Sequence, residues 1–276
     1  MNHRCRAVAG TAAWQEEQRG WYINNKKLFP RTRRLLKQSG FIVAIVKAAR
    51  VAVVDIKKVC WSTTRGQKIQ RYLENKSVKK LHLGTSKSLM TGWLNTDLLP
   101  VRTEVVYLDA TRPFPFKDDV FDYVFSEHMI EHIDYQSGLS MLRECFRVLK
   151  PKGKIRISTP DLKVLTSLHS AEKSAAQKHY VDFMANKWVS EAEYCKDVFV
   201  INNAFRAWGH QFLYDREMLG ATMRRVGFED IKFYQPGVSD DENLQGVESH
   251  GRNTGHEEIN QFAAFAVEGQ VPNPKR

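Results

Sequence analysis

Hydrophobic and polar positions along residues 80–160 follow the pattern of buried strands with a helix between the last two. Five short apolar runs each end at, or just before, a glycine, a proline or an acidic residue; they cover 80–83, 92–97, 104–108, 120–126 and 154–159. Runs of this length and punctuation predict strands of a parallel sheet. Residues 136–149 have apolar positions every three or four residues, which predicts a helix with one buried face. The segment from 120 to 159 therefore predicts one right-handed βαβ unit.

Past Pro160 the chain leaves the strand pattern and returns to it near its C-terminal end. Residues 162–188 carry apolar side chains at helical spacing, which predicts that an insertion at 162–208 either covers the ligand edge of the sheet or forms a surface helical pair. Asp215 is expected to cap a helix that ends at Gly227. We expect strands at 231–234 and 262–267, with the last one in an antiparallel hairpin at the edge of the sheet.

The polar stretch 235–260 predicts a long loop, and long loops in compact domains are either functional or disordered. Glu248 and His250 are candidates to close a substrate pocket, and the alternative is a solvated loop. His256 lies nearby, but the spacing of these three residues matches no defined metal motif. The sequence therefore predicts no metal site.

Three residues lie at the tips of successive predicted strands, namely Gly84, Asp97 and Asp109. A glycine turn lets the backbone approach a ligand, and a carboxylate at the end of the next strand can accept both hydroxyls of a ribose. The carboxyl ends of parallel strands meet at one edge of a sheet, where ligands bind. The pattern predicts a nucleoside-binding α/β enzyme.

These motifs resemble those of the class I S-adenosylmethionine-dependent methyltransferases, and in particular a compact bacterial branch that is methyltransferase type 11-like. The resemblance covers roughly residues 78–267, and its most specific part is 121–132. It implies a Rossmann-like, mostly parallel sheet with an antiparallel last strand, a methyltransferase activity, and S-adenosyl-L-methionine as the cofactor.

The resemblance also assigns a cofactor site. It implies that the turn at Gly84 holds the methionine part of the cofactor, that Asp97 holds its ribose, and that Asp109 lies near its adenine. Residues 126–128, after the fourth strand, face the substrate side. The implied cofactor-binding residues are Gly84, Asp97, Asp109, Ala110, Ser126 and Glu127.

The chain departs from the family pattern at two points. The first turn reads Gly84-Thr85-Ser86, where the family commonly has a second glycine in place of Ser86. A Cβ at Ser86 would crowd the cofactor carboxylate, or its hydroxyl would donate to it. In addition, the short distance from Gly84 to Asp97 leaves little room for a crossover helix, so we expect a first helix of about one turn.

Transfer of a methyl group from a sulfonium requires mainly that the acceptor be held in line, because the cofactor carries the reactivity. A general base is needed only for a hydroxyl or a protonated amine, and histidine has a suitable pKa. The predicted catalytic residues are His128, His132 and His210, and Glu131 is a further candidate. Each has a structural alternative, because Glu131 and His132 could orient a helix and His210 could be a bonded core residue.

The positive charge of the chain is concentrated near its N-terminus. Residues 1–80 contain 19 basic residues (Lys and Arg) and 4 acidic residues (Asp and Glu). Residues 81–276 contain 23 basic and 27 acidic residues. Residues 41–60 read as a basic amphipathic helix, too charged for an easy membrane span. Such a helix packs on its own domain, lies on an anionic membrane or binds nucleic acid. We divide the chain into a basic helical extension, 1–77, and a methyltransferase domain, 78–270, with a helical insertion at 162–208.

These observations leave three functions open. The first is methyl transfer to a small-molecule, saccharide or lipid-precursor acceptor, the second is RNA methylation through the basic arm, and the third is non-catalytic binding on the same fold. The basic N-terminal helix is a candidate for peripheral contact with a membrane, and nucleic acid is a less favoured partner. The start of the chain lacks the pattern of a signal peptide, so a cytoplasmic enzyme, or one at the membrane periphery, is expected. The dispersed cysteines, Cys5, Cys60, Cys145 and Cys195, indicate neither a disulfide framework nor a structural zinc.

Overall fold

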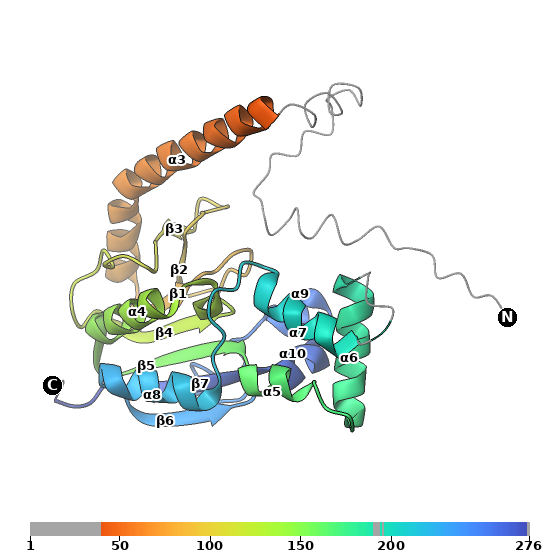
Figure 1. The fold of residues 1–276 in the computed structure, drawn as a ribbon. Helices are drawn as coiled ribbons and strands as arrows, with labels where there is room; N and C mark the ends of the chain where they lie inside the picture. The colour runs from red at the N-terminus through yellow and green to blue at the C-terminus, as the bar shows by residue number, and fades with distance from the viewer. Residues whose placement is uncertain (1–39, 190–193, 195, 275–276) are drawn as a thin grey trace.

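The computed structural model describes residues 40–189, 194 and 196–274, and these contain a sheet of seven strands in the order β3-β2-β1-β4-β5-β7-β6 (Figure 1). The parallel strands at its centre and one side are β1 (Lys80–Leu83), β2 (Leu94–Asp97), β3 (Val106–Tyr107), β4 (Phe121–Glu127) and β5 (Leu149–Pro160). The antiparallel strand β7 (Ala264–Gln270) joins β5 to β6 (Glu229–Tyr234). The predicted Rossmann-like sheet with an antiparallel last strand is confirmed.

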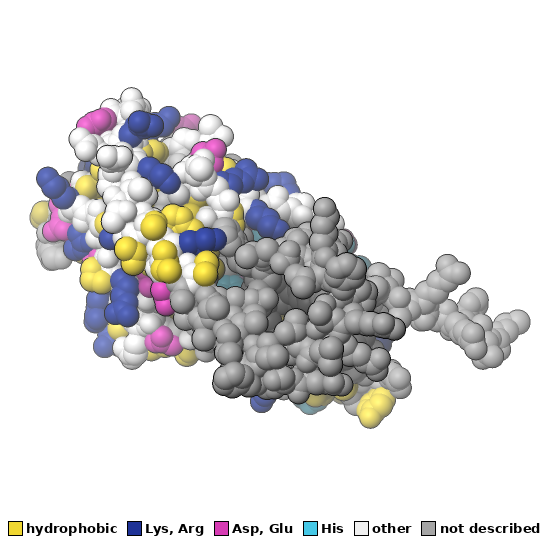
Figure 2. All heavy atoms as spheres, turned by 90° about the horizontal axis from the view of Figure 1, so that it is seen from above, with side chains coloured by type: hydrophobic (Ala, Val, Ile, Leu, Met, Phe, Trp, Pro, Cys, Tyr) yellow, Lys and Arg dark blue, Asp and Glu magenta, His cyan; other side chains and the backbone are white. Residues whose placement is uncertain are grey.

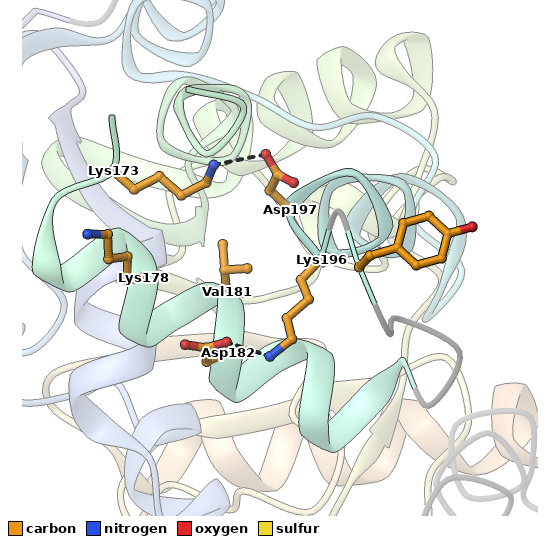
Figure 3. Close-up of a pocket in the computed structure, with 7 residues that line it drawn as sticks. Lys173, Lys178, Val181, Asp182, Lys196 and Asp197 are labelled. Carbon is orange, nitrogen blue, oxygen red and sulfur yellow. Dashed lines mark hydrogen bonds and ion pairs between the residues drawn. The ribbon is translucent and has the colours of Figure 1, made fainter. Parts of the chain in front are cut away.

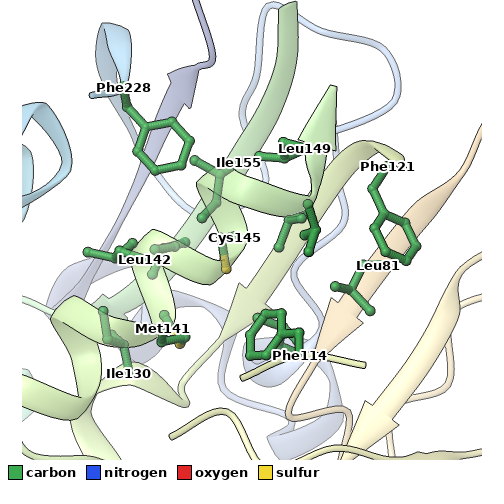
Figure 4. Packing of buried hydrophobic residues seen from close by; sticks show 14 of the residues in the cluster. Leu81, Phe114, Phe121, Ile130, Met141, Leu142, Cys145, Leu149, Ile155 and Phe228 are labelled. Atoms are coloured by element: carbon green, nitrogen blue, oxygen red, sulfur yellow. The ribbon is translucent and has the colours of Figure 1, made fainter. Parts of the chain in front are cut away.

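Helix α4 (Tyr135–Val148) covers one face of the sheet. Of the apolar positions that predicted it, Leu139 and Leu142 are buried and Phe146 is partly buried, whereas Leu149 is the first residue of β5. The helix begins at Asp134, whose carboxylate accepts the backbone amides of Gln136 and Ser137. Its buried face includes Leu142 and Cys145, and Figure 4 shows them beside side chains of β5. Burying a side chain of this size stabilises the fold by about 1.5–3 kcal/mol, so this face holds α4 on the sheet.

The connection between β1 and β2 contains no helix, so the predicted one-turn helix is wrong. Residues 84–93 form successive turns instead. The buried side chain of Asn95 holds them, because its oxygen accepts the Met90 amide and its nitrogen donates to the Met90 and Trp93 carbonyls. With these backbone groups bonded to a side chain, the short connection satisfies its polar groups without helical bonds.

Several short helices gather beyond the ends of β4, β5 and β7 (Figure 1). The insertion at 162–208 supplies α5 (Leu162–Ser167), α6 (Ala175–Trp188) and α7 (Lys196–Arg206), which share a hydrophobic cluster. The stretch predicted as a long loop instead contains α9 (His250–Thr254) and α10 (Glu257–Ala263). That expectation fails because the buried side chains of α10, Ile259 and Ala263, pack into the cluster of the insertion, a contact that no local pattern shows.

Helix α8 (Arg216–Val226) has the predicted ends. The Asp215 carboxylate accepts the Met218 amide at its start, and Gly227 ends it in the left-handed conformation with φ of 117°.

The predicted basic helix is longer than expected and runs as α3 from Gly40 to Asn75. Its C-terminal end is tied to the sheet, since the Tyr72 hydroxyl bonds to the backbone of Lys80 and Gly92. Farther back, Ile56 and Val59 are each 64% exposed, so this part of the apolar stripe does not pack on the domain. Figure 2 shows the molecule from above, and on the described part of that face Lys and Arg side chains are dispersed around hydrophobic ones.

Part of the predicted extension, 1–39, lies outside the described residues, as do Cys5 and Cys195. Within the described part of the chain, no helix is long and apolar enough to cross a membrane.

Candidate active site

A cavity of about 1150 Å³ opens at the carboxyl edge of the parallel strands. Its walls come from the turn after β1, the end of β4, the short helix η1 (Ile130–His132), α6, the segment 208–210, and α9 with α10. Of the residues predicted for catalysis or cofactor binding, five line this cavity: Gly84, Glu127, His128, His132 and His210. The structure therefore brings together the histidines from the two distant parts of the sequence.

The remaining predicted cofactor residues, Asp97, Asp109, Ala110 and Ser126, do not line this cavity. Asp97 ends β2 and accepts the backbone amides of Ser86 and Leu99, each at 2.8 Å. Burial raises the pKa of its carboxyl above the usual value, although those two bonds act in the opposite direction. Asp109 accepts the amide and the hydroxyl of Thr111.

The first turn has the backbone that a close approach to a ligand requires. Gly84 adopts φ of 68°, and a Cβ there would lie 2.6 Å from Cγ of Met129. Ser86, where the related family commonly has glycine, also has positive φ, at 46°. The departure in sequence thus leaves the left-handed turn in place at the cost of a strained serine.

These residues fit a bound S-adenosyl-L-methionine. The Gly84 turn lines the cavity, and the Ser126 hydroxyl next to it in the sheet is buried with no partner among the described residues. Asp97 retains acceptor capacity, because a carboxylate has about four lone-pair sites.

The partly exposed His128 and the buried Glu131 form a pair just after the C-terminal end of β4. One ring nitrogen of His128 lies 3.0 Å from the Glu131 carboxylate and the other lies 2.9 Å from Oδ1 of Asn260. Burial by itself would lower the pKa of His128, but the bond to Glu131, the charges of Glu131 and Glu127, and the Asn260 bond together raise it. Burial would raise the pKa of Glu131, and the contact with His128 lowers it instead. At neutral pH His128 is therefore a cation with both ring nitrogens donating.

His132 and His210 lie edge to face, with ring centroids 5.0 Å apart. Nδ1 of His210 lies 2.6 Å from the carbonyl oxygen of Ala204, so this nitrogen is the donor and Nε2 carries the lone pair. Burial lowers the pKa of His210, which keeps the ring neutral. The His210 ring, unlike that of His128, therefore has a nitrogen lone pair to offer.

The carboxylates of Glu127 and Glu248 are both engaged in hydrogen bonds within the protein. The Glu127 carboxylate accepts the amides of Ser249 and His250 and so holds the start of α9 against β4. Glu248 does not line the cavity; it is buried, pairs with Arg156 at 2.6 Å, and accepts the Gly237 amide. His250 does line the cavity, and its ring packs 4.2 Å from that of His128.

Sequence reasoning missed two kinds of cavity residue. Asn260 had no signal of its own, because it bonds to a histidine 132 positions away. Trp188 ends α6 and Trp208 ends the insertion, and their ring centroids lie 6.1 Å apart. Tryptophans within a predicted lid were the available signal for the second kind.

A smaller hollow of about 400 Å³ lies between α6 and α7 (Figure 3). Its lysines are largely paired, since Lys173 bonds to Asp197 and Lys196 to Asp182. No candidate catalytic residue lines it, so it is a poorer candidate for the active site.

Comparison with known proteins places residues 81–157, from β1 into β5, in a family described as a methyltransferase domain. This match confirms the predicted resemblance to class I S-adenosylmethionine-dependent methyltransferases, the enzyme class and the cofactor. No curated protein matches the chain.

Several solved structures are similar to it. One is a SAM-dependent methyltransferase from Archaeoglobus fulgidus, with 16% identity and a TM-score of 0.42, covering 79% of this chain and 94% of that one. Another, from Thermotoga maritima, is described as a possible histamine N-methyltransferase, with 16% identity, a TM-score of 0.41, and coverage of 72% and 87%. A phosphoethanolamine N-methyltransferase from Haemonchus contortus has 15% identity, a TM-score of 0.35, and coverage of 76% and 52%.

Proposed function

We propose that this S-adenosylmethionine-dependent methyltransferase acts on a small-molecule, saccharide or lipid-precursor acceptor that binds in the cavity beneath the helical insertion. The size of the cavity carries the proposal. Pockets for drug-sized ligands span about 300–1000 Å³, whereas this one measures about 1150 Å³. It has room for an acceptor beside the cofactor.

The insertion contributes an aromatic part of the cavity wall. Tyr180, Trp188 and Trp208 line it, and they belong to α6 and to the segment after α7. Apolar walls with a few placed polar groups are typical of small-molecule sites. This arrangement supports the predicted role of residues 162–208 as the part that selects the acceptor.

The charges of the cavity favour an acceptor with an acidic group. Arg102, Lys187 and Arg252 line it, whereas the two carboxylates in its wall, Glu127 and Glu131, are bonded to α9 and to His128. Fixed cations in a cleft attract anionic ligands. A phosphate- or carboxylate-bearing saccharide or lipid precursor matches this balance.

The chain's own residues have three tasks in such a reaction. When bound, the cofactor supplies an activated methyl group. The Gly84 turn and Asp97 hold the cofactor at the strand tips, the insertion excludes water, and His132 and His210 line the part of the cavity where the acceptor binds. His128, fixed by Glu131 and Asn260, keeps the β4 end and α10 in register.

The test combines product binding with acceptor screening. Full-length protein should bind S-adenosylhomocysteine in a calorimeter, and acidic glycans, lipid precursors and RNA should then be compared as methyl acceptors. Trp208→Ala should raise the KM for the acceptor about tenfold, the effect of losing about 1.4 kcal/mol, without changing the affinity for S-adenosylhomocysteine. Lys178→Ala, in the smaller hollow, is the matched control. Methylation of RNA alone would overturn the proposed acceptor class, and a folded protein without product binding would overturn the function.

A further inference from the structure

Glu131, His132 and His210 bring three metal-ligating side chains together on the cavity wall. One ligand atom from each lies within 4.8 Å of the others, and all three residues line the cavity. His210 is far from the other two in sequence, so no spacing motif announces the cluster. Two imidazoles and a carboxylate are the donor set of many catalytic zinc sites.

The backbone holds the two halves of this cluster together. The amide of Gln211 donates to the Glu131 carbonyl at 2.7 Å, and its side-chain nitrogen donates to the His132 carbonyl at 2.7 Å. The turn before His210 has two left-handed residues, Trp208 at φ of 57° and Gly209 at 79°. A bulky residue with positive φ is rare and persists where the surrounding structure demands it. Here it aims the 208–210 segment at His132.

Two of these three side chains, His210 and Glu131, also have hydrogen-bond partners of the kind that orient the ligands in metal sites. Metal-binding histidines almost always donate their other ring nitrogen to a carbonyl or carboxylate, and ligating carboxylates are themselves hydrogen-bonded. Nδ1 of His210 donates to the Ala204 carbonyl at 2.6 Å, which leaves Nε2 as the ligand atom. The Glu131 carboxylate accepts the Thr159 hydroxyl at 3.1 Å and His128 at 3.0 Å. Lone pairs remain, because a carboxylate offers about four acceptor sites.

We propose that Glu131, His132 and His210 bind one divalent transition-metal ion, with zinc best matched to the donors. Three protein ligands leave a fourth position of a tetrahedral site open, and the cavity adjoins it. An acceptor hydroxyl bound there is held in place and made more acidic by the ion. Metal binding does not depend on the proposed function, whereas this role in acceptor binding rests on it.

The experiment is a metal titration of the full-length protein after treatment with a chelator. Calorimetry with zinc chloride should give one site per chain, and cobalt chloride should give the visible absorption of four-coordinate cobalt. His132→Ala and His210→Ala should each weaken zinc binding more than Thr159→Val, which removes only an outer bond and should cost about 10–100-fold. His179→Ala, an exposed histidine of α6, should bind zinc like the unaltered chain.

Two readouts separate the possible failures. Each variant is also titrated with S-adenosylhomocysteine, which reports folding and the cofactor site. Product binding without zinc binding, or zinc binding equal in all variants, overturns the metal site and leaves the proposed function standing. If His210→Ala does not fold, the test rests on His132→Asn, which changes the shape of the side chain in η1 less than alanine does. This variant should also bind zinc more weakly than Thr159→Val. Zinc binding without product binding supports the metal site and overturns the proposed function.

Discussion

The carboxylate of Asp97 accepts a 2.8 Å hydrogen bond from the backbone amide of Ser86, so the residue that ends β2 also fixes the turn that follows β1. The second oxygen accepts the Leu99 amide. Asp97 therefore shapes the turn after β1, in addition to the ribose contact predicted for it.

Replacing Asp97 with alanine should weaken S-adenosylhomocysteine binding by about 1–3 kcal/mol, the range for losing hydrogen bonds to a charged group. Asp97→Asn keeps one acceptor oxygen for the turn and should lose less. Calorimetric titration of both variants gives the affinities, and Glu229→Ala, an exposed strand residue, is the control. An unchanged affinity in Asp97→Ala would remove this residue from the cofactor site.

Ser86→Gly should stabilise the protein. Left-handed backbone costs a residue with a Cβ about 1–2 kcal/mol, and Ser86 has φ of 46°. Part of the gain is offset by the greater freedom of glycine in the unfolded chain, so we expect a net gain of about 1 kcal/mol or less. Urea denaturation measures it. A lower midpoint than that of the unaltered chain would mean that the serine side chain makes a compensating contact.

His82 should make the fold sensitive to mild acid. Burial lowers its pKa to about 4, although the bond to Asn95 acts in the opposite direction. Because the folded-state pKa lies below the unfolded value of about 6.5, the unfolded chain binds a proton first, and stability falls as the pH drops from about 6.5 toward 4. Between pH 7 and pH 5, His82 alone should lower the free energy of unfolding by about 2 kcal/mol.

The measurement is the free energy of unfolding at pH 7 and pH 5, for the unaltered chain and for His82→Gln. Glutamine keeps a side-chain donor for Asn95 but does not titrate. The loss of stability between the two pH values should be smaller in the variant by about that amount. An equal loss in both proteins would show that other groups cause the acid sensitivity.

Arg156 should be among the most sensitive positions for stability. It is fully buried and bonds at 2.6 Å to both Glu248 and Glu268, so Arg156→Met leaves two buried carboxylates without their partner. Breaking a buried ion pair in this way costs about 3–5 kcal/mol. Lys154→Met on the same strand removes a partly exposed pair with Asp241 and should cost about 1 kcal/mol or less. Chemical denaturation compares the two, and equal losses would contradict the assignment.

Deleting residues 1–60 should leave S-adenosylhomocysteine affinity nearly intact. The anchoring contacts of α3, such as Tyr72 and Ile69, lie after this point. The same deletion should abolish binding to anionic phospholipid vesicles, the membrane contact proposed for the basic helix. Vesicle sedimentation at low and high salt measures it. A truncated protein that fails to fold would show that the removed segment packs on the domain.

The sequence by itself determined the strands, α4 and the ends of α8. Each of these follows from a local signal: a buried run, a three-to-four periodicity, the N-cap Asp215 or the left-handed stop at Gly227. It also placed Gly84, Asp97 and Asp109 at strand tips, because parallel strands deliver their carboxyl ends to one edge. These features depend on neighbours in the chain, which is why a single sequence reveals them.

Only the tertiary structure decided which side chains meet. The helices α9 and α10 form within a polar stretch because of distant partners: α10 packs against the insertion, and the Glu127 carboxylate of β4 holds the start of α9. His210 reaches His132 through a left-handed turn and backbone bonds from Gln211. Asn260 reaches His128, and Glu248 reaches Arg156, across more than ninety positions. Such pairings depend on the geometry of the whole fold, because contacts between distant segments leave no periodicity in the sequence of either one.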